Sequence, residues 1–214
     1  MRIINVLCFA FTVALALAAC VSPASALENF EAKTYPVLVK AVQKTVNVLK
    51  VGSSPAIECE TASFMGQEPM FLPGPTKSLL LNATYGKCKA FGFSSEITIL
   101  GCLYLLMLNG TSTGTLDIKN SGSTKSCEEK PISIRTPTTG CEITIGVQSG
   151  LSGVTFTNES NGTVVANLKL TKIAYKVTKS GLGCPKEGEE STYSGEDTGS
   201  GETEAGSPDE VSVK

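Results

Sequence analysis

The 214-residue sequence contains no histidine and no tryptophan. Without histidine, every mechanism that uses imidazole as an acid, a base or an orienting group is excluded. The sequence also lacks a G-x-S-x-G nucleophile turn and a glycine-rich phosphate loop. It has no C-x-x-C pair, which, together with the missing histidine, argues against a zinc site. The missing tryptophan argues against a carbohydrate-binding platform. We therefore expect no catalytic, cofactor-binding or metal-binding residues.

A concentrated positive charge is also lacking. Residues 27–184 carry 15 Lys or Arg against 11 Asp or Glu, and the bases are scattered along the chain. Nucleic-acid binding proteins instead cluster their bases on one face. Residues 185–214 carry nine acids against two lysines. The charge pattern therefore predicts no nucleic-acid partner.

The chain begins with the features of a secretory signal peptide. Met1-Arg2 is followed by an uncharged, apolar run from Ile3 to Val21 and by the small-residue site Pro23-Ala24-Ser25-Ala26. A positive start, an apolar core and an A-x-A-like site predict cleavage. A membrane-spanning helix needs about 20 apolar residues, so length alone does not exclude an anchor. We expect residues 1–26 to be removed, the protein to be secreted, and no transmembrane segment to remain in the mature chain.

A second route of processing is open at Cys20. The sequence Leu17-Ala18-Ala19-Cys20 fits the bacterial lipobox, in which the cysteine is lipidated and becomes the first residue. A lipid on Cys20 would tether the protein to the cell surface without a spanning helix. Cell-surface attachment is therefore the alternative to release.

Six cysteines remain after residue 26. An even number of cysteines in an exported chain predicts a disulfide framework. These disulfide candidates are Cys59, Cys88, Cys102, Cys127, Cys141 and Cys184.

Strand register suggests one of the pairings. A hairpin that turns at Ser94-Ser95-Glu96 would place Cys88 opposite Cys102, with aromatic and β-branched residues paired beside them. The same spacing recurs between Cys127 and Cys141, but there the turn would fall inside a clear strand. We predict a Cys88–Cys102 bridge and leave the other pairings open.

Strand patterns dominate the chain after residue 26. Apolar and polar residues alternate over 116–118, 132–135 and 141–147, as they do in half-buried strands. Residues 37–49 are rich in β-branched side chains and are also expected to form strands. Turn residues such as Asn161-Gly162 separate these runs. The pattern predicts an all-β, disulfide-bridged β-sandwich, with an open barrel as the alternative.

Two segments carry more specific expectations. The apolar series at 164–170 and 173–177 are out of phase by one residue, which predicts a bulge at Thr171-Lys172 in one long strand. Ile97 to Leu108 is the most apolar stretch after residue 26 and is too short to span a bilayer. We expect it to form a strand buried on both faces.

The last part of the chain differs in composition. Residues 27–184 are expected to form a single β domain, whereas 185–214 form an acidic tail rich in Gly, Ser and Glu. Composition predicts disorder for the tail. An edge strand at 210–213 is the alternative for its end.

The motifs at 34–36, 51–64, 84–93 and 173–175, with the block from Cys88 to Tyr104, resemble a family of uncharacterised secreted proteins from soil actinobacteria. The most specific block runs from Cys88 to Tyr104. The resemblance covers most of residues 30–195 and implies an exported, all-β module. It implies no known activity and no site residues. The other motifs are Gln148 in the Cys141 region and 156–158.

Carboxylates are the remaining candidates for catalysis, because a pair of them can hydrolyse a glycosidic bond. The candidates are Asp117, Glu58, Glu60, Glu96 and Glu142. Exposed acids of this kind are common on β surfaces. We therefore expect a structural or binding domain without catalysis. A carboxylate-dependent hydrolase is one alternative, and a lipid-anchored adhesion protein is the other.

Overall fold

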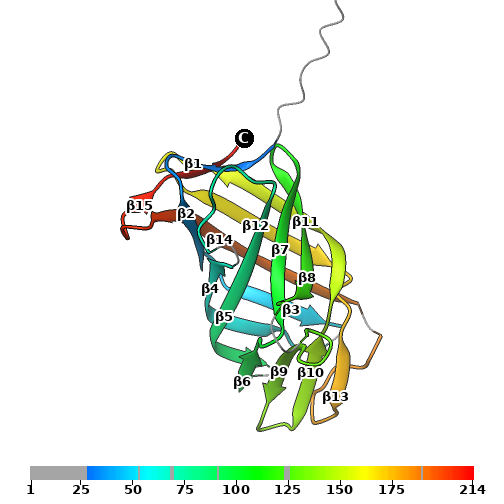
Figure 1. Cartoon of the computed structure of the whole chain (residues 1–214). Helices are drawn as coiled ribbons and strands as arrows, with labels where there is room; N and C mark the ends of the chain where they lie inside the picture. Colours follow the sequence, from blue (N-terminus) through cyan, green and yellow to red (C-terminus); the bar gives the residue numbers. More distant parts are fainter. Residues whose placement is uncertain (1–27, 53, 68–69, 91, 123–125, 189) are drawn as a thin grey trace, which may run out of the picture.

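The computed structural model describes residues 28–214 except 53, 68–69, 91, 123–125 and 189 (Figure 1). This part contains sixteen β-strands and no helix, which confirms the all-β prediction. Over the same residues, therefore, no helix has the length and hydrophobicity that crossing a membrane requires. The predicted signal peptide and the alternative lipidation residue Cys20 lie outside the described residues.

Eight strand positions close into an antiparallel barrel (Figure 1). Neighbours around the barrel follow the order of the chain, and the last strand pairs back with the first position. Of the two predicted arrangements the structure has the barrel, and the barrel is closed. Closure leaves no unpaired barrel edge. The strands are β2 (Val37–Gln43) and β3 (Asn47–Val51), which share one position, then β4 (Ile57–Gly66), β5 (Ser78–Ala90), β7 (Cys102–Gly110), β8 (Thr113–Asn120), β11 (Gln148–Asn158), β12 (Val164–Thr171) and β14 (Ser191–Thr203).

A smaller sheet, here called the end sheet, covers one end of the barrel. Its strand order is β6-β9-β10-β13, and β6 also pairs with the end of β5. It lies at the lower end in Figure 1. Because its isoleucines line the same interior space as barrel residues, the end sheet closes the barrel there. Its strands are β6 (Phe93–Thr98), β9 (Ile132–Thr136), β10 (Cys141–Ile145) and β13 (Lys176–Lys179).

A two-stranded ribbon covers the other end. It pairs β1 (Phe30–Ala32) with β16 (Val211–Val213), while β15 (Pro208–Asp209) pairs with β14. The Phe30 ring meets the Phe156 ring edge-on at 5.4 Å between centroids. The predicted edge strand near the C-terminus therefore exists as β16 and helps to cover the barrel.

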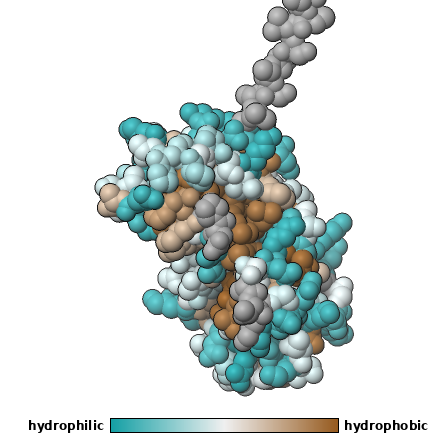
Figure 2. Space-filling model, viewed as in Figure 1, coloured by the Kyte–Doolittle hydropathy of each residue, from teal (hydrophilic) through white to brown (hydrophobic). Residues whose placement is uncertain are grey.

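The surface is hydrophilic over much of the face shown in Figure 2, with hydrophobic residues exposed along its middle. Outward-facing leucines follow from the strand pattern of β5 and β7. Leu80 of β5 and Leu105 of β7 are register partners and alternate with the buried Leu79, Leu81 and Leu106, so they point outward.

All six cysteines of residues 27–184 are bridged, as the disulfide framework predicts, but the predicted pairing is wrong. The bridges are Cys59–Cys88, Cys102–Cys127 and Cys141–Cys184.

The error came from the position of a turn. Ala90 pairs with Phe93 and Cys88 with Ser95, so the hairpin turns earlier than the sequence suggested. Gly92 has a φ of 80°, a conformation that glycine adopts without strain. Cys88 instead faces Cys59 across β4 and β5.

The segment from Ile97 to Leu108 is not one strand buried on both faces. It contains the end of β6 and most of β7, with a bend between them at which Leu100 is 62% exposed. Gly101 at this bend allows a close approach, because a Cβ there would lie 2.5 Å from the carbonyl oxygen of Ser126. β7 belongs to the barrel, whereas β6 pairs with the end of β5 and with β9 of the end sheet.

The out-of-phase series around Thr171-Lys172 do not form one bulged strand, because the first series lies in β12 and only Val177 of the second lies in a strand, β13. β12 ends at Thr171, and Lys172 has a φ of 58°. The chain then leaves the barrel, and β13 pairs with β10 of the end sheet. Left-handed backbone at Lys172 redirects the chain instead of inserting a bulge.

The prediction of disorder for the acidic tail is wrong for residues 191–203. This segment is β14, which pairs with β12 on one side and with β2 and β3 on the other. Tyr193, Gly195 and Asp197 alternate with exposed or half-exposed polar residues and face the interior. The inward residues are mostly small or polar, so the hydropathy pattern of an ordinary strand is absent.

Candidate functional site

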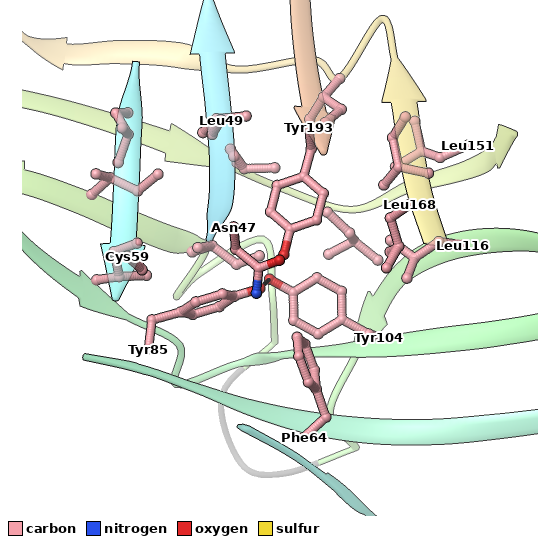
Figure 3. A pocket seen from close by; sticks show the side chains of 18 residues that line it. Asn47, Leu49, Cys59, Phe64, Tyr85, Tyr104, Leu116, Leu151, Leu168 and Tyr193 are labelled. Atoms are coloured by element: carbon pink, nitrogen blue, oxygen red, sulfur yellow. Dashed lines mark hydrogen bonds between the residues drawn. The ribbon is translucent and has the colours of Figure 1, made fainter. Parts of the chain in front are cut away.

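The barrel interior holds a cavity of about 80 Å³ next to the end sheet. Its wall is almost entirely aliphatic or aromatic, as Figure 3 shows. Well-packed protein interiors have few voids larger than a water molecule, so a void of this size is a candidate binding site. This lower cavity is lined by Asn47, Leu49, Ile57, Cys59, Phe64, Tyr85, Ile97, Tyr104, Leu116, Ile118, Ile132, Ile134, Ile145, Leu151, Leu168, Leu170, Ile173 and Tyr193.

Three tyrosines from different strands converge on one side of this cavity. Tyr85 of β5, Tyr104 of β7 and Tyr193 of β14 direct their hydroxyl groups toward the amide of Asn47 (Figure 3). The hydroxyls of Tyr85 and Tyr104 are 3.5 Å apart. The Phe64 ring packs edge-on against both of their rings, with centroids 6.0 Å and 6.3 Å away. The Phe64 ring thus packs against two of the three tyrosines, and all three hydroxyl groups are directed at the same amide group.

Asn47 connects these tyrosines to a buried carboxylate. Its Nδ2 donates to Asp197 Oδ1 and to Gln43 Oε1, both at 3.3 Å. Gln43 Nε2 in turn donates to the carbonyl oxygen of Cys59 at 3.0 Å. Asn47 is 2% exposed and Asp197 is 4% exposed. We call Gln43, Asn47, Asp197 and the three tyrosines the polar layer.

The break between β2 and β3 sets the position of Asn47. The backbone N–H groups of Lys44 and Thr45 both donate to the carbonyl oxygen of Glu196, and Thr45 Oγ1 accepts from the N–H of Glu196. Asn47 begins the next strand directly after this break. It packs over Gly195, where a Cβ would lie 1.7 Å from Asn47 Oδ1.

A second cavity, of about 60 Å³, lies between the polar layer and the β1–β16 ribbon. Asp197 and Gly199 line it from β14, together with apolar residues such as Leu81 and Phe156. Asn47 faces the lower cavity and Asp197 the upper one. The polar layer therefore divides an apolar barrel interior into two compartments.

Two buried polar atoms in this layer have no hydrogen-bond partner within 3.5 Å, although the hydroxyl groups of Tyr85 and Tyr193 lie close enough to influence each other's pKa. The two atoms are Asn47 Oδ1 and the hydroxyl oxygen of Tyr193. A buried polar group without a partner costs about 1–3 kcal/mol, so most native ones are satisfied by protein or by a bound molecule. Both residues line the lower cavity, which makes that cavity the place for a polar group of a ligand.

Burial perturbs the ionisable groups of the layer. Loss of solvent raises the pKa of Asp197 to about 6, although the hydrogen bond from Asn47 acts in the opposite direction. Burial also raises the pKa values of Tyr85, Tyr104 and Tyr193 well above their usual range, so the phenols stay protonated. The described residues that line the two cavities include no lysine or arginine. The lower cavity, whose described lining residues include no charged side chain, therefore suits an uncharged ligand.

None of the five acids that were candidates for the hydrolase alternative lines either interior cavity. Glu58 and Glu60 are exposed on the outside of β4, and Glu96 is exposed on β6. Asp117 is buried on β8, where it accepts from the N–H of Gly150 at 2.6 Å and lies 3.1 Å from Lys119 Nζ. The structure does not bring these acids together with Glu142 as a pair in a pocket.

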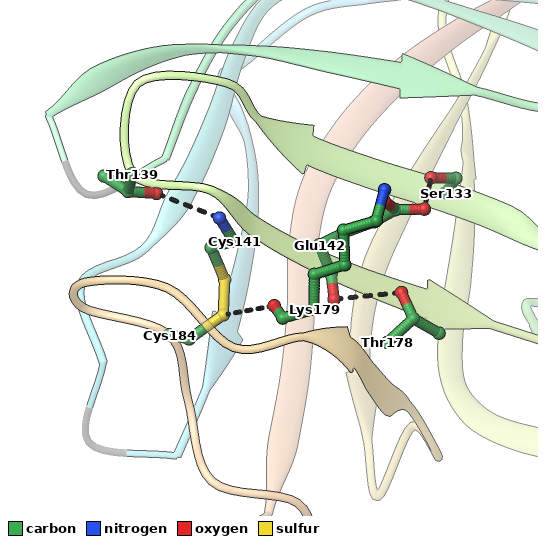
Figure 4. Close-up of polar contacts among 7 residues, drawn as sticks. All are labelled: Ser133, Thr139, Cys141, Glu142, Thr178, Lys179 and Cys184. Carbon is green, nitrogen blue, oxygen red and sulfur yellow. Dashed lines mark hydrogen bonds and ion pairs between the residues drawn. A yellow bond between two sulfur atoms is a disulfide. The ribbon is translucent and has the colours of Figure 1, made fainter.

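Glu142 instead supports the end sheet beside a disulfide (Figure 4). Its Oε2 lies 2.6 Å from Lys179 Nζ, and this contact lowers the pKa of the carboxyl group despite partial burial. The neighbouring Cys141 is bridged to Cys184. These contacts fix β10 to β13 and to the chain that follows β13.

The disulfides are the one set of candidate residues that the structure brings together. Cys59 lines the lower cavity, and its bridge to Cys88 joins β4 to β5. Across the described ranges no group of three or more His, Cys, Asp or Glu side chains is arranged to hold a metal ion.

Asn47, Asp197 and Tyr193 were not recognised from the sequence. Tyr193 and Asp197 lie in the segment that composition assigned to a disordered tail. One signal could have found them: Tyr193, Gly195 and Asp197 are spaced by two and alternate with Ser194 and Glu196, as residues on one strand face do.

Fold and site together define a disulfide-bridged, closed eight-stranded antiparallel barrel with an occluded, mostly apolar interior. Comparisons with known proteins add no name to this class. No family model matches the chain, and no curated protein or solved structure matches it either.

Proposed function

We propose that the protein is an exported binding protein that holds a small, largely apolar molecule inside the barrel and carries out no catalysis. The observation that carries this proposal is the lower cavity, whose apolar wall contains two buried polar atoms without partners. Eight-stranded barrels are either filled by side chains or wide enough to hold one small ligand.

The size of the cavity limits the ligand. Typical sites for drug-sized molecules occupy about 300–1,000 Å³. The lower cavity, at about 80 Å³, is far smaller. An engineered cavity of about 150 Å³ lined by aliphatic and aromatic residues binds benzene. The ligand is therefore a molecule, or a part of one, with only a few heavy atoms.

The disulfides support export. Three bridges are typical of proteins that fold in oxidising compartments. The signal-peptide pattern in residues 1–26 agrees with secretion, and Cys20 provides the alternative of lipid attachment at the cell surface. Mass spectrometry of the mature N-terminus separates the two, because an unmodified start at Leu27 excludes the lipid.

The alternative functions have less support. A carboxylate-dependent hydrolase requires two acids in a shared pocket, and the five candidate acids do not line the cavities. No contact or surface among the described residues favours an adhesion role over ligand binding.

The test is a titration of the oxidised protein with pentane, followed by NMR of isoleucine and leucine methyl groups. We expect saturable shifts of the methyl groups that line the lower cavity, such as those of Leu116 and Leu168. Leu168→Phe should remove the shifts by filling the space. The matched control Leu100→Phe changes a residue that is 62% exposed and should leave them unaltered. Shifts that persist in Leu168→Phe would refute the proposal.

A further inference from the structure

The two unsatisfied atoms of the lower cavity differ in what they require. Asn47 Oδ1 only accepts hydrogen bonds, whereas the Tyr193 hydroxyl can donate one and accept another. Both atoms belong to residues that line the lower cavity, and Figure 3 shows the Tyr193 hydroxyl directed at the Asn47 amide. A ligand group that satisfies both at once must donate and accept.

A hydroxyl group is the smallest group that does so. Its O–H donates to Asn47 Oδ1, and its oxygen accepts from the Tyr193 O–H. An ether or ketone oxygen only accepts and would leave Asn47 Oδ1 unpaired. An ionised carboxylate also only accepts, and its charge adds a desolvation cost.

The charges around the cavities disfavour ions. Neither cavity is lined by a described lysine or arginine that could pair with an anion. The Asp197 carboxylate lies directly behind Asn47 and would repel one. A cation in the lower cavity would be separated from Asp197 by the Asn47 amide, which already donates to that carboxylate at 3.3 Å. The site therefore selects a neutral polar group.

The rest of the wall selects an apolar body. Ile118, Leu168 and Leu170 line the cavity below the polar layer, and isoleucines of the end sheet close it. At about 80 Å³ the space accepts a slender body and not a wide ring system.

We propose that the ligand is a slender, uncharged alcohol whose hydroxyl group bonds to Tyr193 and Asn47 while its apolar chain lies in the lower cavity. This inference rests on the proposed binding function and specifies the class of ligand.

The experiment is a thermodynamic cycle on the oxidised full protein. Binding of n-pentanol and of pentane is measured by methyl NMR in the unaltered protein and in Tyr193→Phe. The substitution removes only a hydroxyl that has no partner, so the protein keeps its fold. We expect n-pentanol to bind about tenfold more weakly to Tyr193→Phe, as the loss of one hydrogen bond predicts, and pentane to change by less than about twofold.

A second substitution controls for the loss of any phenolic hydroxyl. Tyr175 donates to the carbonyl oxygen of Lys186 and does not line the lower cavity. Tyr175→Phe should therefore leave the affinities for both probes unchanged. Pentanoate and pentylamine at neutral pH complete the set, and we expect neither to bind in the cavity.

The outcomes separate this inference from the function on which it rests. Equal weakening of n-pentanol and pentane, or tighter binding of pentanoate or pentylamine than of n-pentanol, overturns the alcohol inference and leaves an apolar binding site. No binding of any probe, with an ordered water bridging the two atoms, overturns both.

Discussion

Two glycines on the inner face of β14 provide a matched test of how the polar layer is built. Gly195 and Gly199 are four residues apart in the same strand and face the same interior. A Cβ on Gly195 would lie 1.7 Å from Asn47 Oδ1 and 2.9 Å from Asn47 Cγ. A Cβ on Gly199 would lie 3.4 Å from the carbonyl oxygen of Val164, which is ordinary contact. Both glycines have backbone conformations that alanine can adopt.

Gly195→Ala must therefore displace Asn47. Overpacking of a close-fitting interior costs about 1–3 kcal/mol. Displacement of Asn47 also removes its hydrogen bonds to Asp197 and Gln43, and a buried group left unpaired costs a further 1–3 kcal/mol, approximately. We expect a loss of about 2–6 kcal/mol in the free energy of unfolding. Gly199→Ala should instead gain about 0.5–1 kcal/mol, because glycine weakens a strand interior by that amount.

Urea denaturation of the oxidised proteins measures both changes. The change in the free energy of unfolding should have opposite signs at the two positions. Equal stability of the two variants would show that Asn47 does not occupy the space over Gly195, and the polar layer as described would be wrong.

Three further predictions concern the layer and the end sheet. Asp197 has a pKa raised from 3.8 to about 6, so the folded state holds its proton more tightly than the unfolded chain does. This contribution to stability is present at low pH and is lost as the pH rises from about 4 to about 6. Asp197→Asn should remove this loss, which amounts to about 3 kcal/mol. Urea denaturation at several pH values measures it, and an equal dependence of the free energy of unfolding on pH in both proteins would contradict the prediction. Tyr193→Phe should leave the melting temperature unchanged or raise it, because the hydroxyl has no partner; calorimetric destabilisation above about 1 kcal/mol would show that the hydroxyl is satisfied. Replacement of both Cys141 and Cys184 by alanine opens a link between residues 43 positions apart and should cost about 4 kcal/mol on the chain-entropy model; urea midpoints equal to those of the unaltered protein would refute this.

Alternation in the sequence was sufficient to find many of the strands. The runs at 132–135, 141–147 and 164–170 correspond to β9, β10 and β12, because each buries one face and exposes the other. The same pattern could not distinguish a sandwich from a barrel, since both bury one face of every strand. Closure depends on the pairing of β14 with β2 and β3, which are about 150 residues away in the chain.

The hydropathy pattern did not predict β14, for a physical reason. Its inner face carries Tyr193, Asp197 and three glycines, because the polar layer, the cavities and close neighbours occupy the space that large side chains would fill. Hydrophobicity therefore does not mark the buried face of this strand. The candidate site was missed together with this strand, which supplies Tyr193 and Asp197.

The wrong disulfide prediction has a different cause. Equal numbers of residues on either side of Ser94-Ser95-Glu96 made a long hairpin plausible, but Gly92 allows an earlier turn. Register then changes for every later residue. Cys102 pairs with Cys127 because β7 lies against the other part of β5, away from Cys88.

The most direct test of the binding account is the location of bound n-pentanol by intermolecular NOEs in isotope-filtered NMR. The account predicts contacts from the alkyl chain to methyl groups of Leu168, Ile118 and Leu170, and from the carbon that bears the hydroxyl to the ring of Tyr193. Contacts confined to exposed side chains such as Leu182, which is 81% exposed, would contradict it.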